Sequence, residues 1–445
     1  MSVENSRRLL GRQLDRRQLL KASAATAAGL GVASQSQVAR GQDAVTLRVA
    51  VYQEPARVEV QRRFIEAFEQ AHPSIKVALE SADFSTYYTK LNTNLAAGRA
   101  PDVFMMSGAY FYAGAMRNAF KDLGPYVKQA GIDLNSYFTE AENSMYQGKL
   151  LAVPEELDIL ALAYNKDLFD QAGVAYPTDV WTWDDLLDAA TKLTRKSSDG
   201  RQTYGIYSVN NIQEMWGNLV KQNGGSFLTA DKKKSAINTP EAIEAVQFAV
   251  DLIYKHKVSP TAQGVSSLPG YIESGGSPFM TGLVAMKIQG NYELGVLLEN
   301  DAFAWDVVTI PQRKIKGGLA WSQAWVMYEK TKHPDEAWQF IEYMLSDEAN
   351  KIIGDTPNKG QCPPLKSAAY AAPYGAPPPD HMKAFLDGYE YRQSFEFHPA
   401  WLEYGTAYGK ALDPVFAGET PVADALNAAA DEVNNILARY KDFQP

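Results

Sequence analysis

Residues Val45-Thr46-Leu47-Arg48-Val49-Ala50-Val51 place apolar side chains at every second position, the pattern of a β-strand. Apolar residues recur at helical spacing over 60–71, a second strand pattern covers 75–79, and a further helix pattern covers 88–98, where a glycine ends it. Residues 103–106 are uniformly apolar, as in a buried strand. Short strands that alternate with helices predict an α/β fold with a largely parallel sheet.

Later helix starts carry capping signals. Thr182 and Asp185 have the spacing of a capping box, in which each residue binds the backbone N–H of the other. Thr239-Pro240 and Thr420-Pro421 each place an N-cap residue before a proline at the first helical position. These signals predict helices over the residues that follow.

The composition narrows the class of protein. A chain of 445 residues with 46% hydrophobic and 21% charged residues suits a globular protein with two compact parts. The single cysteine, Cys362, excludes an intramolecular disulfide and a cysteine-based metal cluster. The five histidines lack metal-ligand spacing, and no phosphate-loop, nucleophile-elbow or calcium-loop motif is present. We expect no catalytic residues, no metal and no cofactor.

The N-terminus has the pattern of an export signal. Asp15-Arg16-Arg17-Gln18-Leu19-Leu20-Lys21 precedes a weakly apolar run over 22–33. The run is too short for a membrane-spanning helix, which needs about 20 residues. The segment resembles a twin-arginine signal, which implies the twin-arginine (Tat) export machinery as a partner and residues 1–42 as a signal peptide and flexible N-terminus. We expect a periplasmic protein without a lipid anchor, because no cysteine lies near the cleavage region.

The charge of the remaining chain excludes some partners. The whole chain has 43 Lys or Arg and 52 Asp or Glu, and the first 42 residues contain seven and two of these, so 36 basic and 50 acidic residues remain. This acidic balance argues against nucleic acid and anionic lipid as partners.

Three blocks in a fixed order carry a family resemblance. They are Tyr87-Tyr88-Thr89-Lys90-Leu91 with Ala97-Gly98-Arg99-Ala100-Pro101-Asp102-Val103, then Gly148-Lys149-Leu150-Leu151-Ala152-Val153-Pro154 with Tyr164-Asn165-Lys166-Asp167-Leu168-Phe169 and Trp181-Thr182-Trp183-Asp184-Asp185-Leu186, and finally Phe279-Met280-Thr281-Gly282-Leu283-Val284-Ala285-Met286 with Gly290-Asn291-Tyr292. The order resembles family 1 of the extracellular solute-binding proteins of ABC importers, the maltose-binding-protein-like group. The likeness extends from about residue 45 to about residue 440.

The resemblance implies a type II periplasmic-binding-protein-like fold, a clamp of two α/β lobes. The N-terminal lobe is expected to hold 43–157 plus 319–358, and the C-terminal lobe 158–318 plus 359–445. The chain would cross between the lobes near 156–159, 316–318 and 359–363. These crossings would be hinges that let the lobes close on a ligand.

Ligands in open α/β sheets sit beyond the carboxyl ends of strands, so residues that follow strands are the first candidates. Amides and carboxylates suit sugar hydroxyl groups, and aromatic rings can stack on sugar faces. In the first part of the chain the candidates are Tyr52, Gln53, Glu54, Asp83, Phe84, Ser107, Gly108 and Tyr110.

A second group of candidates lies near the expected crossings and in the second lobe. The resemblance implies that Asp158 faces the cleft and that Tyr292 holds the place of a sugar-stacking aromatic residue. Glu155 and Glu156, beside Asp158, are expected to be exposed hinge charges. The full second group is Asp158, Trp216, Gly290, Asn291, Tyr292, Trp321 and Gln361.

The predicted function is therefore capture of a sugar or oligosaccharide outside the cytoplasm and its delivery to the membrane permease of an ABC importer. The candidate group contains no Arg or Lys, which favours a neutral ligand. We expect a monomer that contacts the permease transiently. Two alternatives remain open: the same clamp with glycerol phosphate, a polyamine or another non-sugar ligand, and an exported carbohydrate-active enzyme, which would need a pair of carboxylates.

Overall fold

The computed structural model describes residues 44–52, 58–138, 144–196, 200–271, 277–356 and 359–444. The proposed export signal and the candidate ligand residues Gln53 and Glu54 lie outside the described residues. Among the described residues, no helix has the length and apolar character needed to cross a membrane.

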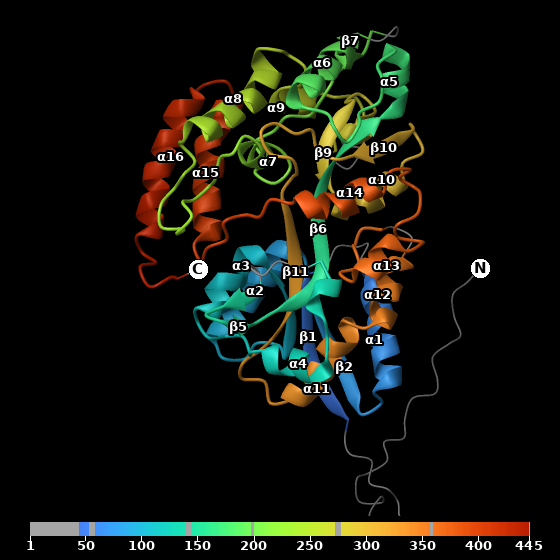
Figure 1. The fold of residues 1–445 in the computed structure, drawn as a ribbon, viewed down its shortest axis with the longest axis vertical. Coiled ribbons are helices and arrows are strands. Elements are labelled where there is room, and N and C mark those ends of the chain that lie inside the picture. The colour runs from blue at the N-terminus through green and yellow to red at the C-terminus, as the bar shows by residue number, and fades with distance from the viewer. Residues whose placement is uncertain are drawn as a thin grey trace, which may run out of the picture. The chain divides into compact units, whose positions relative to one another are not determined.

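One mixed sheet organises the described chain (Figure 1). Its strand order is β10-β6-β11-β3-β1-β2, and β9 also pairs with β6. The strands are β1 (Val45–Tyr52), β2 (Ile75–Ala82), β3 (Val103–Ser107), β6 (Val153–Asn165), β9 (Met286–Gly290), β10 (Trp305–Val308) and β11 (Ala320–Met327). Two short hairpins lie outside the sheet, β4 (Met145–Tyr146) with β5 (Lys149–Leu150) and β7 (Arg195–Lys196) with β8 (Gln202–Thr203).

Strand β6 belongs to two parts of the sheet. Its first half pairs with β11 from Val153 to Ile159, and its second half pairs with β9 from Leu160 and with β10 from Leu162. All 13 residues of β6 are buried. We call β1, β2, β3, β11 and the first half of β6 the β1 region, and β9, β10 and the second half of β6 the β9 region. In Figure 1 the β1 region lies in the lower half of the view and the β9 region in the upper half.

The prediction of an α/β fold is confirmed, but the prediction of a largely parallel sheet is wrong. Parallel pairing joins β1 to β2 and β1 to β3. The pairs that involve β6 and β11 are antiparallel. The reason is that β6 and β11 are the strands by which the chain passes between the two regions, so they run against their neighbours instead of closing strand–helix–strand units.

Helices cover both regions. The β1 region has α1 (Val58–Ala71), α2 (Phe84–Ala96), α3 (Gly108–Ala115), α4 (Gly124–Ala130), α11 (Pro334–Met344) and α12 (Asp347–Gly354). Helix α13 (Lys366–Tyr370) contacts both α12 and the helix over 383–388. The β9 region has α5 (Lys166–Ala172), α6 (Trp183–Leu193), α7 (Trp216–Gln222), α8 (Pro240–Tyr254), α9 (Ala262–Ser266), α10 (Leu294–Leu298), α14 (Lys383–Gly388), α15 (Trp401–Phe416) and α16 (Val422–Leu437). Short 3-10 turns are η2 (Leu134–Ser136), η4 (Phe279–Thr281), η5 (Asn291–Glu293) and η6 (Tyr389–Tyr391).

The predicted capping signals are mostly confirmed. Thr182 and Asp185 form the capping box of α6, and Thr239 caps α8 ahead of Pro240. The last helix begins one residue later than expected, with Pro421 at the N-cap.

Candidate functional site

Strand register brings several candidate residues to one edge of the β1 region. Tyr52 and Ala82 are the last paired residues of β1 and β2, so Asp83 follows at the same edge. Ser107 ends β3 and lies opposite Gln323 of β11, which in turn lies opposite Glu156 of β6. The predicted cluster at strand ends therefore forms a continuous row across the sheet.

Aromatic rings line this edge. The Tyr52 ring centroid lies 5.1 Å from that of Phe84, and the Phe84 ring contacts Tyr88 at 4.9 Å and Tyr110 at 6.2 Å. The rings of Tyr88 and Tyr110 are stacked, with centroids 3.5 Å apart. Phe84 remains 44% exposed. It is the ring of this group that can offer a free face to a ligand.

The polar candidates at the same strand ends are engaged locally. Asp83 caps α2, because its carboxylate accepts the Thr86 N–H at 3.0 Å, and the Thr86 contacts lower its pKa. The Ser107 N–H donates to the Tyr88 hydroxyl at 2.7 Å, and Gly108 begins α3. Asp83 is exposed, whereas Ser107 and Gly108 are buried. Their roles in ligand binding stay predictions.

Three carboxylates of β6 lie in the middle of the molecule. Glu155 accepts from the Gln361 amide at 2.6 Å, Glu156 accepts from the Tyr52 hydroxyl at 3.4 Å, and Asp158 accepts from the Gln323 amide at 2.7 Å. Each carboxylate therefore has a polar neighbour from another segment. The expectation of exposed hinge charges at Glu155 and Glu156 is wrong, because they are 4% and 0% exposed. Strand β6 is covered on both faces, so its polar side chains are buried with its apolar ones.

Asn291 fixes the strand crossing itself. Its side-chain oxygen accepts the Ile159 N–H at 2.8 Å, and its amide nitrogen donates to the Leu157 carbonyl at 2.9 Å. The side-chain oxygen and nitrogen of Asn291 thus both bind the backbone of β6 at the point where the strand changes partners. The side chain of Asn291 is 1% exposed, which suits a structural role as well as the predicted binding role.

Gly290 is required by the ring that follows it. A Cβ atom at this position would lie 2.0 Å from the Tyr292 ring. The backbone of Gly290 is extended, with φ of −85°, so the need for glycine is one of space. The missing side chain lets the Tyr292 ring fold back over the end of β9.

A second row of aromatic rings begins at Tyr292. Its ring centroid lies 6.2 Å from that of Trp321, and Trp321 lies 5.8 Å from Phe395. Phe395 contacts Trp401 at 4.7 Å. The structure brings together the predicted residues Tyr292 and Trp321 and adds Phe395 and Trp401, which sequence reasoning missed. No local pattern marks the latter two, because they reach this row only through the fold.

Trp216 lies on the inner side of α7. It is 1% exposed, its indole N–H donates to Asn210 at 3.0 Å, and its ring contacts Phe227 edge-on at 6.0 Å. These contacts place the ring in the hydrophobic core of the β9 region, whereas Phe84 presents an open face. Its role as a ligand platform stays a prediction.

A charged cluster beside Tyr292 was also missed by sequence reasoning. The Tyr292 hydroxyl donates to Glu214 at 3.1 Å, and the Lys287 ammonium lies 3.6 Å from the same carboxylate. Lys287 also donates to both oxygens of Glu293, at 2.8 and 2.7 Å. Burial raises the pKa of Glu214 to about 7, with Lys287 opposing and Glu293 reinforcing the shift. Glu214 and Lys287 lie far apart in the sequence, so no local pattern joins them.

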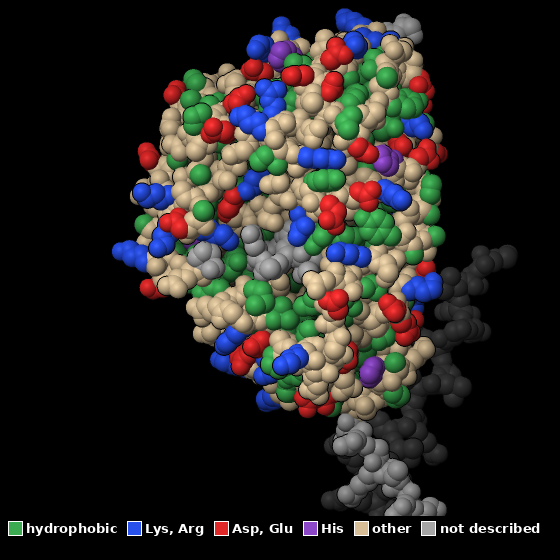
Figure 2. Space-filling view, viewed as in Figure 1, with side chains coloured by type: hydrophobic (Ala, Val, Ile, Leu, Met, Phe, Trp, Pro, Cys, Tyr) green, Lys and Arg blue, Asp and Glu red, His purple; other side chains and the backbone are tan. Residues whose placement is uncertain are grey.

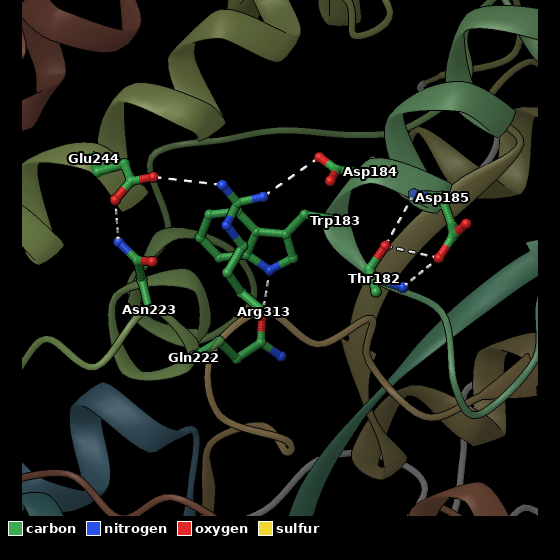
Figure 3. Close-up of polar contacts among 8 residues, drawn as sticks. All are labelled: Thr182, Trp183, Asp184, Asp185, Gln222, Asn223, Glu244 and Arg313. Atoms are coloured by element: carbon green, nitrogen blue, oxygen red, sulfur yellow. Dashed lines mark hydrogen bonds and ion pairs between the residues drawn. The ribbon is translucent and has the colours of Figure 1, made fainter.

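A network of polar contacts ties α6 and α7 to the segment that leads into β11 (Figure 3). The Trp183 indole N–H donates to the Gln222 side chain at 2.8 Å, and the Gln222 amide donates to the Gly317 carbonyl at 2.8 Å. Arg313 lies over the Trp183 ring, 5.2 Å from its centroid, as Figure 3 shows. The second expected crossing is therefore anchored to α7, the helix that begins at Trp216.

Acidic and basic side chains are interspersed over the face drawn in Figure 2, and hydrophobic side chains gather near its middle, over the upper part of the β1 region. Within the described part of the chain, no group of three or more His, Cys, Asp or Glu side chains is placed to hold a metal ion.

A model of the bacterial extracellular solute-binding proteins matches residues 54–351. The chain belongs to this family. This solute-binding protein is similar to an ABC substrate-binding protein of Listeria monocytogenes in complex with cycloalternan, with a TM-score of 0.78 and 27% identity, over 89% of this chain and 100% of that chain. The match confirms the predicted type II, two-lobed clamp fold.

Two curated relatives extend over most of the solute-binding protein. A binding protein of Brucella abortus is 23% identical over 424 residues, 93% of this chain and 97% of its own. The galactooligosaccharide-binding protein of Bacillus subtilis is 23% identical over 387 residues, 82% of this chain and 84% of its own.

Proposed function

We propose that this protein is the substrate-binding subunit of an ABC importer that captures a sugar or oligosaccharide and delivers it to the membrane permease. The single observation that carries the proposal is the Tyr292–Trp321 ring pair beside the buried carboxylate Asp158, because Trp321 lies opposite Asp158 in the β6–β11 pairing. Carbohydrate recognition uses aromatic rings that stack on sugar faces and carboxylates that accept hydrogen bonds from hydroxyl groups. The ligands of the Listeria and Bacillus relatives support the same class.

The β1 and β9 regions are the proposed lobes. In this proposal strand β6 passes from one lobe to the other between Ile159 and Leu160, two residues beyond the expected boundary after residue 157. Gln361, near the third expected crossing, contacts Glu155 of β6. In this proposal the lobes close over the ligand, and Phe84 of the β1 region meets it from the side opposite Tyr292.

The first test is thermal shift of residues 43–445 against neutral sugars, acidic sugars, polyols, polyamines and glycerol phosphates. A ligand at 100 times its Kd should add about 2.7 kcal/mol to the free energy of unfolding. A shift with a neutral sugar that is recovered unchanged would support the proposal. A shift with glycerol phosphate or a polyamine alone would support a binding protein but contradict the sugar ligand. Consumption of a sugar would favour an enzyme.

A matched pair of variants tests the site. Phe84→Ala removes an exposed ring at the proposed cleft and should weaken sugar binding about 2- to 10-fold, the range expected for one aromatic contact. Tyr370→Ala removes a ring of similar exposure, 42% against 44%, from α13 and should leave binding unchanged. Equal effects of the two variants on Kd, measured by calorimetry, would contradict the proposed site.

The export route forms a separate part of the proposal. If residues 1–42 are a twin-arginine signal, replacing Arg16 and Arg17 together by lysine should retain the full-length protein in the cytoplasm. The control variant has Arg7 and Arg8 replaced by lysine. It loses the same number of arginines outside the proposed signal motif and should be exported normally. We also propose that the exported protein is a monomer, which light scattering would check.

A further inference from the structure

A cavity of about 400 Å³ lies in the β9 region next to Tyr292. We call it the side pocket. Its charged wall is formed by Glu214, Lys287 and Glu293, and its apolar wall includes Val209, Met280 and Val296. The volume falls within the range of about 300–1,000 Å³ that is usual for small-molecule sites.

The side pocket adjoins the proposed cleft through one carboxylate. Glu214 lines the pocket and also accepts the hydrogen bond of the Tyr292 hydroxyl at 3.1 Å. The Tyr292 ring also contacts Trp321, with ring centroids 6.2 Å apart. A ligand that stacks on Tyr292 therefore ends within reach of the pocket.

The charged wall is built to keep its geometry without a ligand. Lys287 is 7% exposed and rises from β9, where Ala163 of β6 is its pairing partner. Both oxygens of Glu293 hold its ammonium, and the Glu214 carboxyl group lies 3.6 Å from it. Two carboxyl groups facing one ammonium give the wall several acceptors for hydroxyl groups, and an acidic balance above about pH 7, where Glu214 is ionised.

We propose that the side pocket is a further subsite of the cleft, which takes an additional polyhydroxylated ring of the ligand and selects neutral over anionic ligands. The inference rests on the proposed function, because it assumes that the cleft binds a carbohydrate. The apolar wall would contact the face of the added ring, and the carboxylates would accept from its hydroxyl groups. Above about pH 7, where Glu214 is also ionised, an anionic group would be repelled, since Lys287 is already held by Glu293.

The first experiment tests ligand length. Val296 lines the pocket and is 53% exposed, so Val296→Trp can fill the pocket with little effect on folding. The probes are neutral sugars of one, two and three rings that shift the melting temperature of the natural protein. The variant should bind the longer sugars at least about tenfold more weakly by calorimetry and the single-ring sugar unchanged. Val180→Trp, at a site that is 70% exposed and outside the pocket, is the control and should bind all probes normally.

The second experiment tests charge selection. Glu293→Gln removes one carboxylate but keeps an acceptor for Lys287. At pH 8, where Glu214 is ionised, the ratio of the Kd for a uronic acid to the Kd for the matching neutral sugar should fall roughly tenfold, because one repulsive charge is lost.

The outcomes separate the two levels of the proposal. If Val296→Trp weakens the binding of sugars of every length equally, or weakens none, the side pocket is not a subsite for ligand length. The proposed function would still stand. An unchanged Kd ratio in Glu293→Gln would overturn the charge selection. Absence of carbohydrate binding by the natural protein would overturn the proposed function and this inference together.

Discussion

Glu214 differs from an ordinary surface glutamate because burial keeps it protonated at pH values where other glutamates are ionised. Its pKa is raised to about 7, and its neighbours are Lys287, Glu293 and Tyr292. Between the ordinary pKa of 4.5 and the raised value, the folded protein binds a proton that the unfolded chain has released. The contribution of Glu214 to stability is therefore fully present below pH 4.5 and is lost as the pH rises through 7.

We predict that Glu214→Gln flattens the pH dependence of stability. Each unit of pKa shift corresponds to about 1.4 kcal/mol, so the free energy of unfolding of the natural protein should fall more between pH 5 and 8 than that of the variant. Urea unfolding at a series of pH values measures the difference. Glu329→Gln, a change at an exposed glutamate, is the control. Parallel pH profiles for all three proteins would show that Glu214 titrates normally.

Asn291 supports a second prediction at this scale. Asn291→Ala leaves the Ile159 N–H and the Leu157 carbonyl buried without their side-chain partner. An unsatisfied buried backbone group costs about 1–3 kcal/mol, so the variant should lose about 2–4 kcal/mol. Asn135→Ala, at an exposed position of η2, should change stability by less than about 0.5 kcal/mol. Chemical unfolding that shows similar losses for both would contradict the assigned role.

At the scale of elements, α7 connects the proposed site to the second crossing. The helix begins at Trp216, two residues after Glu214, and ends at Gln222, which holds the Gly317 carbonyl. Asn218, in the middle of the helix, accepts the Leu319 N–H at 2.7 Å. One short helix thus contacts the crossing at two points while its first turn lies next to the charged cluster. A shift of α7 on ligand binding would be transmitted to the start of β11.

The contacts of Figure 3 differ in their expected energies. Gln222→Leu leaves the buried Trp183 N–H and the Gly317 carbonyl unpaired and should cost about 2–4 kcal/mol. Arg313→Ala removes ion pairs to Asp184 and Glu244, whose side chains are 84% and 51% exposed, and should cost only about 1 kcal/mol. Thermal unfolding compares the two. A larger loss for Arg313→Ala would mean that the exposed charges, and not Gln222, hold the crossing.

Particular elements show how far sequence reasoning reached. The strands β1, β2 and β3 and the capping box of α6 follow local rules, so their patterns predicted them. Local patterns do not predict strand β6 as a unit, because Pro154 and three carboxylates interrupt its apolar residues. Tyr292 was predicted from the family resemblance, and Trp321 from its place just after the expected second crossing. Glu214, Phe395 and Trp401 depend on contacts between distant segments, which no local pattern records.

At the scale of the whole molecule, the proposed lobes predict a closing motion. Fluorescent labels on cysteines introduced at Val180 and Lys128, which are exposed in the β9 and β1 regions, should come closer when a sugar saturates the site. The native Cys362 is buried and should not react. Labels at Lys90 and Lys128, both in the β1 region, should keep their separation. Binding without a change in the first pair would contradict lobe closure.

The position of β11 has a consequence for how the chain is made. This strand lies between β6 and β3, yet it follows β6 in the sequence by more than 150 residues, at Ala320–Met327. The N-terminal half of the sequence leaves the ribosome first, but it lacks the strand that joins β3 to β6. The β1 region therefore cannot complete its sheet during translation until the ribosome has passed Met327.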